Sequence, residues 1–274
     1  MSYPRTALIS DLHSNLPALT TAVADARARG VERFVCLGDM IGYGAQPRQV
    51  LDLVLRLCVA GAKDPSSGAA LADGHCLLGN HENALLNSPE DFNPKARAAI
   101  EWTREELLRG PIEPGLPDYF DFLSGLEASG VDDVALFAHG SPREPVKEYM
   151  LPRDSQNAEK LAANFRAMAA RERAVAFVGH SHVPAVYSED GGLFRPTGTD
   201  GPYDLGLGAK KRAIVNVGSV GQPRDGDPRL SYVLFDGRAI TFVRLDYDHA
   251  AAAAAIRAVP DLPDFLAERL FAGR

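Results

Sequence analysis

Short apolar runs alternate with segments of helical spacing through the first half of the chain. After the first run, Leu16, Leu19 and Val23 recur at helical intervals, which predicts a helix that ends at Gly30. Alternation of this kind indicates βαβ units around a largely parallel sheet. The predicted strands are residues 6–10, 34–37, 75–78, 134–138 and 175–178, and further predicted helices are residues 47–60, 94–108, 119–123 and 157–168.

Beyond residue 178 the apolar pattern changes to a period of two, which is typical of antiparallel strands. Residues 61–74 are predicted to form a loop. Residues 197–212 lack periodicity and are expected to form a surface insertion, whereas residues 248–271 start at the N-cap candidate Asp248 and are expected to be helical. The predicted hairpins pair residues 185–188 with 193–195 and residues 232–235 with 239–243.

Hydrophobic residues make up 46% of the chain and charged residues 24%, which is ordinary for a globular enzyme and excludes a disordered or fibrous protein. Its 274 residues, without internal repeats, predict a single domain over residues 1–274. The formal net charge of −7 provides no general basic field, so stable binding of duplex nucleic acid is not expected. The sequence has no signal-peptide pattern and no apolar stretch of transmembrane length, so a cytoplasmic location without membrane association is expected. The oligomeric state stays open.

Five polar motifs follow predicted strands, where side chains of an α/β sheet converge on one crevice. Asp11 and His13 are two residues apart just beyond a strand, as are His180 and His182. In extended geometry each pair points the same way, so each is expected to approach one ion from one side. The motifs are Asp11-Leu12-His13, Gly38 to Gly44 around Asp39, Gly79-Asn80-His81-Glu82, His139-Gly140 and Gly179-His180-Ser181-His182.

The donor types in these motifs indicate a metal centre. Imidazoles, carboxylates and an amide oxygen without thiolate suit Mn, Fe, Co, Ni or Zn ions. The donor set is too large for one ion, and Asp39 could bridge two, which predicts two divalent metal ions and a phosphoryl substrate.

In their order and composition, the motifs resemble those of the calcineurin-like metallophosphoesterase superfamily over nearly the whole chain. The resemblance implies an α/β fold, a four-layer α/β/β/α sandwich of two mixed sheets. It implies that a metal-bridging hydroxide attacks the phosphate ester and that His81 is the catalytic residue, which stabilises developing charge or protonates the leaving oxygen. It assigns one metal to Asp11, His13, Asp39 and His182, and the second to Asp39, Asn80, His139 and His180.

Departures from the superfamily pattern narrow the resemblance. Protein Ser/Thr phosphatases carry Asp-Arg-Gly after the second motif, whereas this chain has Gly42-Tyr43-Gly44. Together with residues 216–219 and 221–224, this form looks like the small prokaryotic phosphodiesterase branch. Arg224 is then a candidate for binding substrate phosphate. Tyr43 either packs or contacts substrate, and Glu82 either orients His81 or caps the following turn.

The leading hypothesis is therefore a metal-dependent phosphodiesterase or phosphomonoesterase acting on a small substrate such as a nucleotide. A protein phosphatase or dinucleoside polyphosphate hydrolase is the alternative enzyme, which the missing Asp-Arg-Gly sequence disfavours. A non-catalytic metal-binding scaffold, as in the retromer subunit that shares this fold, is the alternative from another class. The intact His81 argues against it.

Overall fold

Two six-stranded sheets lie face to face in the computed structural model, which describes residues 3–59, 61, 63, 68, 70–90, 92–206 and 211–274. In the first sheet β1, β2 and β3 run parallel, and β11, β12 and β9 add antiparallel neighbours on the other side. Its strand order is β3 (His75–Cys76), β2 (Arg33–Cys36), β1 (Thr6–Ile9), β11 (Leu230–Phe235), β12 (Ala239–Leu245) and β9 (Asp200–Asp204).

The second sheet is also mixed. Its three central strands β5, β6 and β10 run parallel, while β4 and β7 pair antiparallel with them. Its strand order is β4 (Ser129–Val131), β5 (Ala135–Ala138), β6 (Val175–Val178), β10 (Ala213–Asn216), β7 (Ala185–Ser188) and β8 (Leu193–Phe194).

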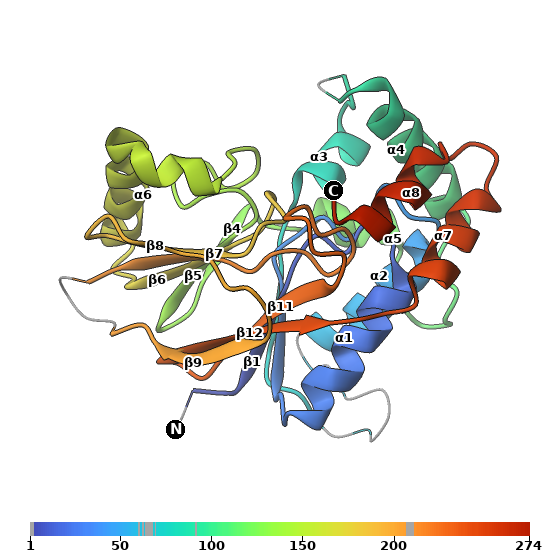
Figure 1. Ribbon diagram of the computed structural model, residues 1–274. Coiled ribbons are helices and arrows are strands. Elements are labelled where there is room, and N and C mark those ends of the chain that lie inside the picture. The colour runs from blue at the N-terminus through green and yellow to red at the C-terminus, as the bar shows by residue number, and fades with distance from the viewer. Residues whose placement is uncertain are drawn as a thin grey trace.

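Helices cover the outer faces of both sheets. Figure 1 shows α6 on one side of the paired sheets and α1, α2 and α7 on the other. None of the helices in the described ranges is long and apolar enough to cross a bilayer. The helices are α1 (Leu16–Ala28), α2 (Pro47–Cys58), α3 (Asn80–Leu86), α4 (Pro94–Leu107), α5 (Tyr119–Ser124), the 3₁₀ helix η1 (Pro152–Gln156), α6 (Ala158–Ala170), α7 (His249–Arg257) and α8 (Phe265–Ala272).

Three hydrophobic clusters separate four layers, which confirms the predicted α/β/β/α sandwich of two mixed sheets. On β6, Phe177 points between the sheets, whereas Val178 points toward α6. On β1, Leu8 points between the sheets and Ile9 points toward α1 and α2. Both faces of these strands are buried, which is why they appear in the sequence as continuous apolar runs rather than alternating ones.

Several elements differ from the sequence-based expectation. Strands β4 and β10 and helix α3 were not predicted. Within the segment 197–212, expected to be a surface insertion, β9 forms the edge of the first sheet by pairing with β12. Its side chains are largely exposed, so it lacks the apolar signal of the central strands. Residues 207–210 of that segment, and residues 62, 64–67 and 69 of the predicted loop 61–74, lie outside the described residues.

Candidate metal centre

All seven candidate metal ligands stand just beyond the carboxyl ends of parallel strands. Those strands belong to both sheets, so the two sheets bring their polar ends to one place. Asp11 and His13 follow β1, Asp39 follows β2, Asn80 follows β3 and begins α3, His139 follows β5, and His180 and His182 follow β6.

Five of these residues have a left-handed rather than an extended backbone, which corrects the expectation from the spacing of the two pairs. Asp11, Asp39 and His180 have φ values of 54°, 53° and 62°, and His13 and His182 are also in the left-handed region. Left-handed conformations are strained for non-glycine residues and cluster at functional sites. Hydrogen bonds from the Asp11 N–H to the Gly38 carbonyl and from the His13 N–H to the Asp39 carbonyl, both 3.0 Å, hold the first two loops together.

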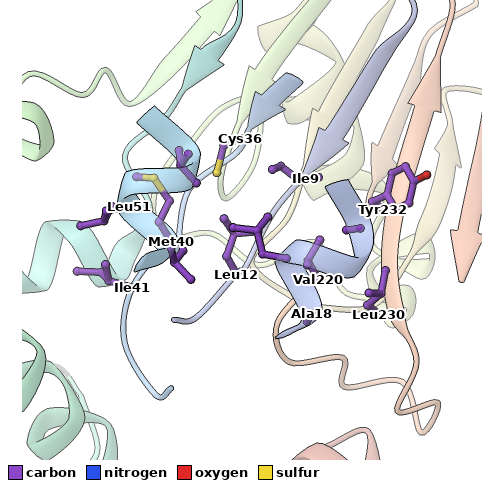
Figure 2. Close-up of a cluster of buried hydrophobic side chains, with 14 of the residues drawn as sticks. Ile9, Leu12, Ala18, Cys36, Met40, Ile41, Leu51, Val220, Leu230 and Tyr232 are labelled. Carbon is purple, nitrogen blue, oxygen red and sulfur yellow. The ribbon is translucent and has the colours of Figure 1, made fainter. Parts of the chain in front are cut away.

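Buried apolar residues inside the motifs anchor the same loops in the hydrophobic core. Leu12 lies between two of the candidate ligands, and Met40 and Ile41 directly follow a third. All three side chains are fully buried, and Figure 2 shows them in the cluster that also contains Val220. The apolar residues inside each motif therefore anchor the loop, while their polar neighbours face the crevice.

The candidate ligands form two clusters that share Asp39. Within each cluster one donor atom per residue lies within 4.8 Å of every other. His180 and His182 fall into different clusters, so the expectation that this pair approaches one ion is wrong. Asn80 joins the second cluster, with Oδ1 3.0 Å from Nε2 of His139. The first cluster is Asp11, His13, Asp39 and His182, and the second contains Asp39, His139 and His180.

Backbone carbonyls orient all four imidazoles. In each ring one nitrogen lies within hydrogen-bond distance of a carbonyl oxygen, and the other nitrogen faces the shared centre. An N–H that donates to a carbonyl fixes the tautomer and leaves the inner nitrogen as a metal ligand. The pairs are His13 Nδ1 with Ile41 O at 3.2 Å, His139 Nδ1 with Leu37 O at 3.1 Å, His180 Nε2 with Lys147 O at 3.2 Å, and His182 Nδ1 with Gln222 O at 2.5 Å.

Several acceptor atoms of the first cluster lack a hydrogen-bond donor among the described residues. Burial lowers the pKa of both His13 and His182, which favours neutral rings. Their Nε2 atoms then face each other at 3.2 Å, each with a lone pair. The buried Oδ1 of Asp11 lies 3.1 Å from Nε2 of His182, but in this tautomer that nitrogen has no proton to donate, so the oxygen accepts no hydrogen bond among the described residues. Buried acceptors without donors are costly, and a divalent cation would satisfy all three. The donor set therefore fits a metal ion.

Charges in the second cluster favour metal binding coupled to proton release. Burial raises the pKa of the Asp39 carboxyl, but the His139 and His81 imidazoles outweigh it and hold that pKa well below its usual range. Burial opposes protonation of His139, yet Asp39 raises the pKa of that ring to about 9. A metal ion that binds here must displace the His139 proton, because only the deprotonated nitrogen is a ligand.

A cavity of about 240 Å³ opens onto the centre. His81 lines it, is only 2% exposed, and places Nε2 3.9 Å from Oδ2 of Asp39. Tyr43 and Arg224 line the same cavity, so the structure brings both substrate-binding candidates to the centre. Tyr149, which the sequence did not single out, also lines it and stacks on the His180 ring with centroids 3.7 Å apart. An isolated tyrosine in a connecting segment carries no sequence signal for such a position.

Glu82 holds the second motif in place. Its carboxylate accepts hydrogen bonds from the backbone N–H groups of Asp39, Met40 and Ile41, and also caps α3 by accepting from Gly79. The structure thus favours the cap over an orienting contact with the His81 side chain. Burial and the nearby Asp39 charge raise the pKa of Glu82 to about 7, whereas its four N–H donors favour the ionised form.

Comparisons with known proteins identify the family and the fold of this chain. The calcineurin-like phosphoesterase superfamily domain matches residues 5–239. An uncharacterized protein of Methanocaldococcus jannaschii is 33% identical over 98% of both chains. The crystal structure of a metallophosphoesterase from Sphaerobacter thermophilus has a TM-score of 0.78 at 34% identity and covers 99% of this chain and 100% of its own. A hypothetical protein from Pyrococcus horikoshii shares the fold, with a TM-score of 0.73 at 18% identity and 98% coverage of both chains.

The fold and the centre define a metal-dependent phosphoric ester hydrolase. The chain belongs to the calcineurin-like phosphoesterase superfamily, whose members depend on divalent metals and act on phosphate esters.

Proposed function

We propose that this protein is a binuclear metal-dependent phosphoesterase. It hydrolyses a phosphodiester or phosphomonoester bond of a small substrate, with nucleotides among the candidates. Asp11, His13, Asp39 and His182 hold one divalent ion in this proposal, and Asp39, Asn80, His139 and His180 hold the other.

The arrangement of the four histidines carries the proposal. Each ring has one nitrogen against a backbone carbonyl and turns the other toward a buried cluster that shares Asp39. Imidazole and carboxylate donors are compatible with Mn²⁺, Fe²⁺, Co²⁺, Ni²⁺ or Zn²⁺. Two such ions would bind phosphoryl oxygens and make a water molecule nucleophilic near neutral pH.

His81 acts on the leaving group in this proposal. Its ring lines the cavity, and its Nδ1 has no hydrogen-bond partner among the described residues. Burial lowers the pKa of His81 to about 4 despite the opposing Asp39 charge, so the ring is neutral at pH 7. A neutral imidazole still has one N–H, which can donate a hydrogen bond to the leaving oxygen. That hydrogen bond becomes stronger as negative charge develops on the oxygen.

Metal removal followed by add-back tests the proposal. The protein would be stripped with a chelator, and hydrolysis of a chromogenic phosphodiester and a phosphomonoester would be measured with each ion added separately. We expect turnover to return with at least one ion, and Asp39→Asn to lose both turnover and one bound metal, because Asp39 belongs to both clusters.

Three outcomes would change the assignment. Full turnover by Asp39→Asn would contradict it. Bound metal without turnover on any ester would favour a non-catalytic scaffold. A strong preference for a phosphopeptide or a dinucleoside polyphosphate over both chromogenic esters would favour the alternative enzymes that the missing Asp-Arg-Gly sequence disfavours.

A further inference from the structure

Two guanidinium groups from distant parts of the chain lie against the ring of Tyr43. The carbon atoms at the centres of the Arg224 and Arg269 guanidinium groups are each 5.7 Å from the ring centroid. Arg224 belongs to the segment between β10 and β11, whereas Arg269 belongs to α8 near the C-terminus. Tyr43 itself follows Asp39 in the second motif. The C-terminal helix therefore brings a second positive charge to the edge of the candidate active site.

Both arginines are held in place. The backbone N–H of Arg224 donates to the His182 carbonyl at 3.2 Å, and its guanidinium donates to Oε1 of Gln222 at 2.7 Å. Nε of Arg269 donates to the backbone oxygen of Arg274, and its guanidinium also lies over the Phe265 ring at 5.4 Å. Side chains fixed in this way lose little further conformational entropy when they bind a ligand.

Within the described part of the chain, these two charges lack the aspartate partners that several other arginines have. Arg33, Arg229 and Arg244 each form an ion pair with an aspartate. Among the described residues, no side-chain carboxylate forms an ion pair with Arg224 or Arg269. Half-burial and the nearby Arg224 charge lower the pKa of Arg269 to about 10. Two like charges placed together without a side-chain carboxylate between them repel each other, and a bound anion would relieve that repulsion.

The arginine pair lies beside the candidate metal centre rather than apart from it. Arg224 and Tyr43 line the cavity together with His81 and Asp39. The backbone N–H of Arg224 also donates to the carbonyl of His182, a candidate ligand of the first cluster, so Arg224 is joined directly to the metal-centre loop. An anion held by the two arginines would therefore belong to a molecule that also reaches the metal centre.

We propose that Arg224 and Arg269 form a second anion site beside Tyr43, which binds a negatively charged group of the substrate other than the phosphoryl group that is cleaved. The substrate class is then a phosphate ester with a second phosphate or a carboxylate. Guanidinium groups bind both anions through paired, charge-assisted hydrogen bonds. This inference rests on the proposed function, because it assigns the metal centre to the cleaved phosphoryl group.

Calorimetric titration with inorganic phosphate tests the second site. Metal-loaded protein would first be freed of unbound metal. We expect the wild-type protein to bind two phosphates, one at the metal centre and one at the arginine pair. Arg269→Gln should weaken the second site at least tenfold. Arg224→Gln should do the same without altering α8, which covers the case in which the first variant folds poorly. Arg238→Gln is the matched control, since Arg238 pairs with Asp204 at an exposed sheet edge and should keep both sites.

The variants separate failure of this inference from failure of the proposed function. Asp39→Asn should lose the phosphate at the metal centre and keep the one at the arginine pair. If Asp39→Asn keeps both phosphates while Arg269→Gln loses one, the second anion site stands and the proposed metal chemistry fails. If Arg224→Gln and Arg269→Gln both bind phosphate as the wild-type protein does, the second anion site is overturned.

Discussion

The Glu82 carboxylate accepts a hydrogen bond from the backbone N–H of Asp39 at 2.8 Å. In return, Oδ1 of Asp39 accepts one from the backbone N–H of His81 at 2.9 Å, so the loop after β2 and the first turn of α3 fix each other. The proposed bridging ligand is thus oriented by a buried carboxylate that does not itself enter either cluster.

Glu82→Gln should loosen the metal centre without removing a ligand. The amide NH₂ would replace an acceptor oxygen and face backbone N–H groups, which leaves buried donors unpaired. We expect metal affinity to fall by about 10–100-fold, as for other residues that support metal ligands. Competition with a chelator of known affinity measures this. Glu101→Gln, on the exposed face of α4, is the control and should bind metal normally. Unchanged affinity in Glu82→Gln would show that this support is dispensable.

His81→Ala should retain both metals and lose most turnover. His81 lines the cavity but belongs to neither cluster, so its loss removes only the hydrogen bond to the leaving oxygen. We expect kcat to fall by about 10²–10⁴-fold, the usual contribution of a positioned acid–base group. Elemental analysis and steady-state kinetics on the same sample check both parts. His75→Ala, outside the motifs, is the matched control and should keep the wild-type kcat. Equal kcat in the two variants would show that His81 does not act in the reaction.

Gly42→Ala should impair the same step by displacing His81. A Cβ at Gly42 would lie 2.2 Å from Nδ1 of His81, so the ring must move. Gly191 has a similar φ, 91° against 84°, but nothing within 4 Å of its added Cβ. Gly191→Ala therefore controls for backbone strain, which costs about 1 kcal/mol or more for a non-glycine residue at positive φ. We expect a large loss of kcat in Gly42→Ala only. Equal kcat losses in both variants would assign the effect to strain.

How far the sequence predicts this fold depends on whether the signal is local. Strands β5 and β6 are buried on both faces, so their apolar runs identify them directly. Strand β9 is exposed and is defined by its pairing with β12, which no local pattern reveals. Helix α3 is short and begins inside the Gly79 to Glu82 motif. Its first turn therefore consists of polar site residues and shows no apolar residues at helical spacing.

The same distinction applies to the site. Strand ends predict that Asp11 and Asp39 converge, because parallel strands direct their carboxyl ends to one edge. His139 follows β5 of the second sheet, so its position also depends on how the two sheets pack together. The left-handed backbone of Asp11 could not be predicted, since it depends on a hydrogen bond to Gly38 in another loop. The position of Arg269 beside Tyr43 could not be predicted either. Arg269 reaches Tyr43 only because α8 packs against the rest of the domain, where Lys95 of α4 lies 4.1 Å from the centre of the Phe265 ring.

Stability at acid pH should depend on Asp132, which precedes β5 and so lies at the opposite end of that strand from His139. Oδ2 of Asp132 accepts hydrogen bonds from Nη1 of Arg33 and from the Tyr3 hydroxyl, both at 2.7 Å. Burial raises the pKa of Asp132, but the bonds from Tyr3 and Arg33 outweigh it and lower that pKa below its usual value. A carboxyl whose folded pKa is lowered stabilises the fold above its unfolded pKa, about 3.9, and loses that contribution as pH falls through the folded pKa.

Asp132→Asn should therefore destabilise the protein at neutral pH and matter less in acid. We expect the free energy of unfolding at pH 7 to fall by about 2–3 kcal/mol, because Arg33 is left buried without its charged partner. As the pH falls below the unfolded pKa toward the lowered folded pKa, the wild-type protein loses this contribution, so the stabilities of the two proteins should approach each other. Urea unfolding at pH 7, 5 and 3 measures the difference. Asp204→Asn, which breaks the exposed pair with Arg238, should have little effect at any pH. A difference that stays constant down to pH 3 would mean that the Asp132 charge does not stabilise the fold.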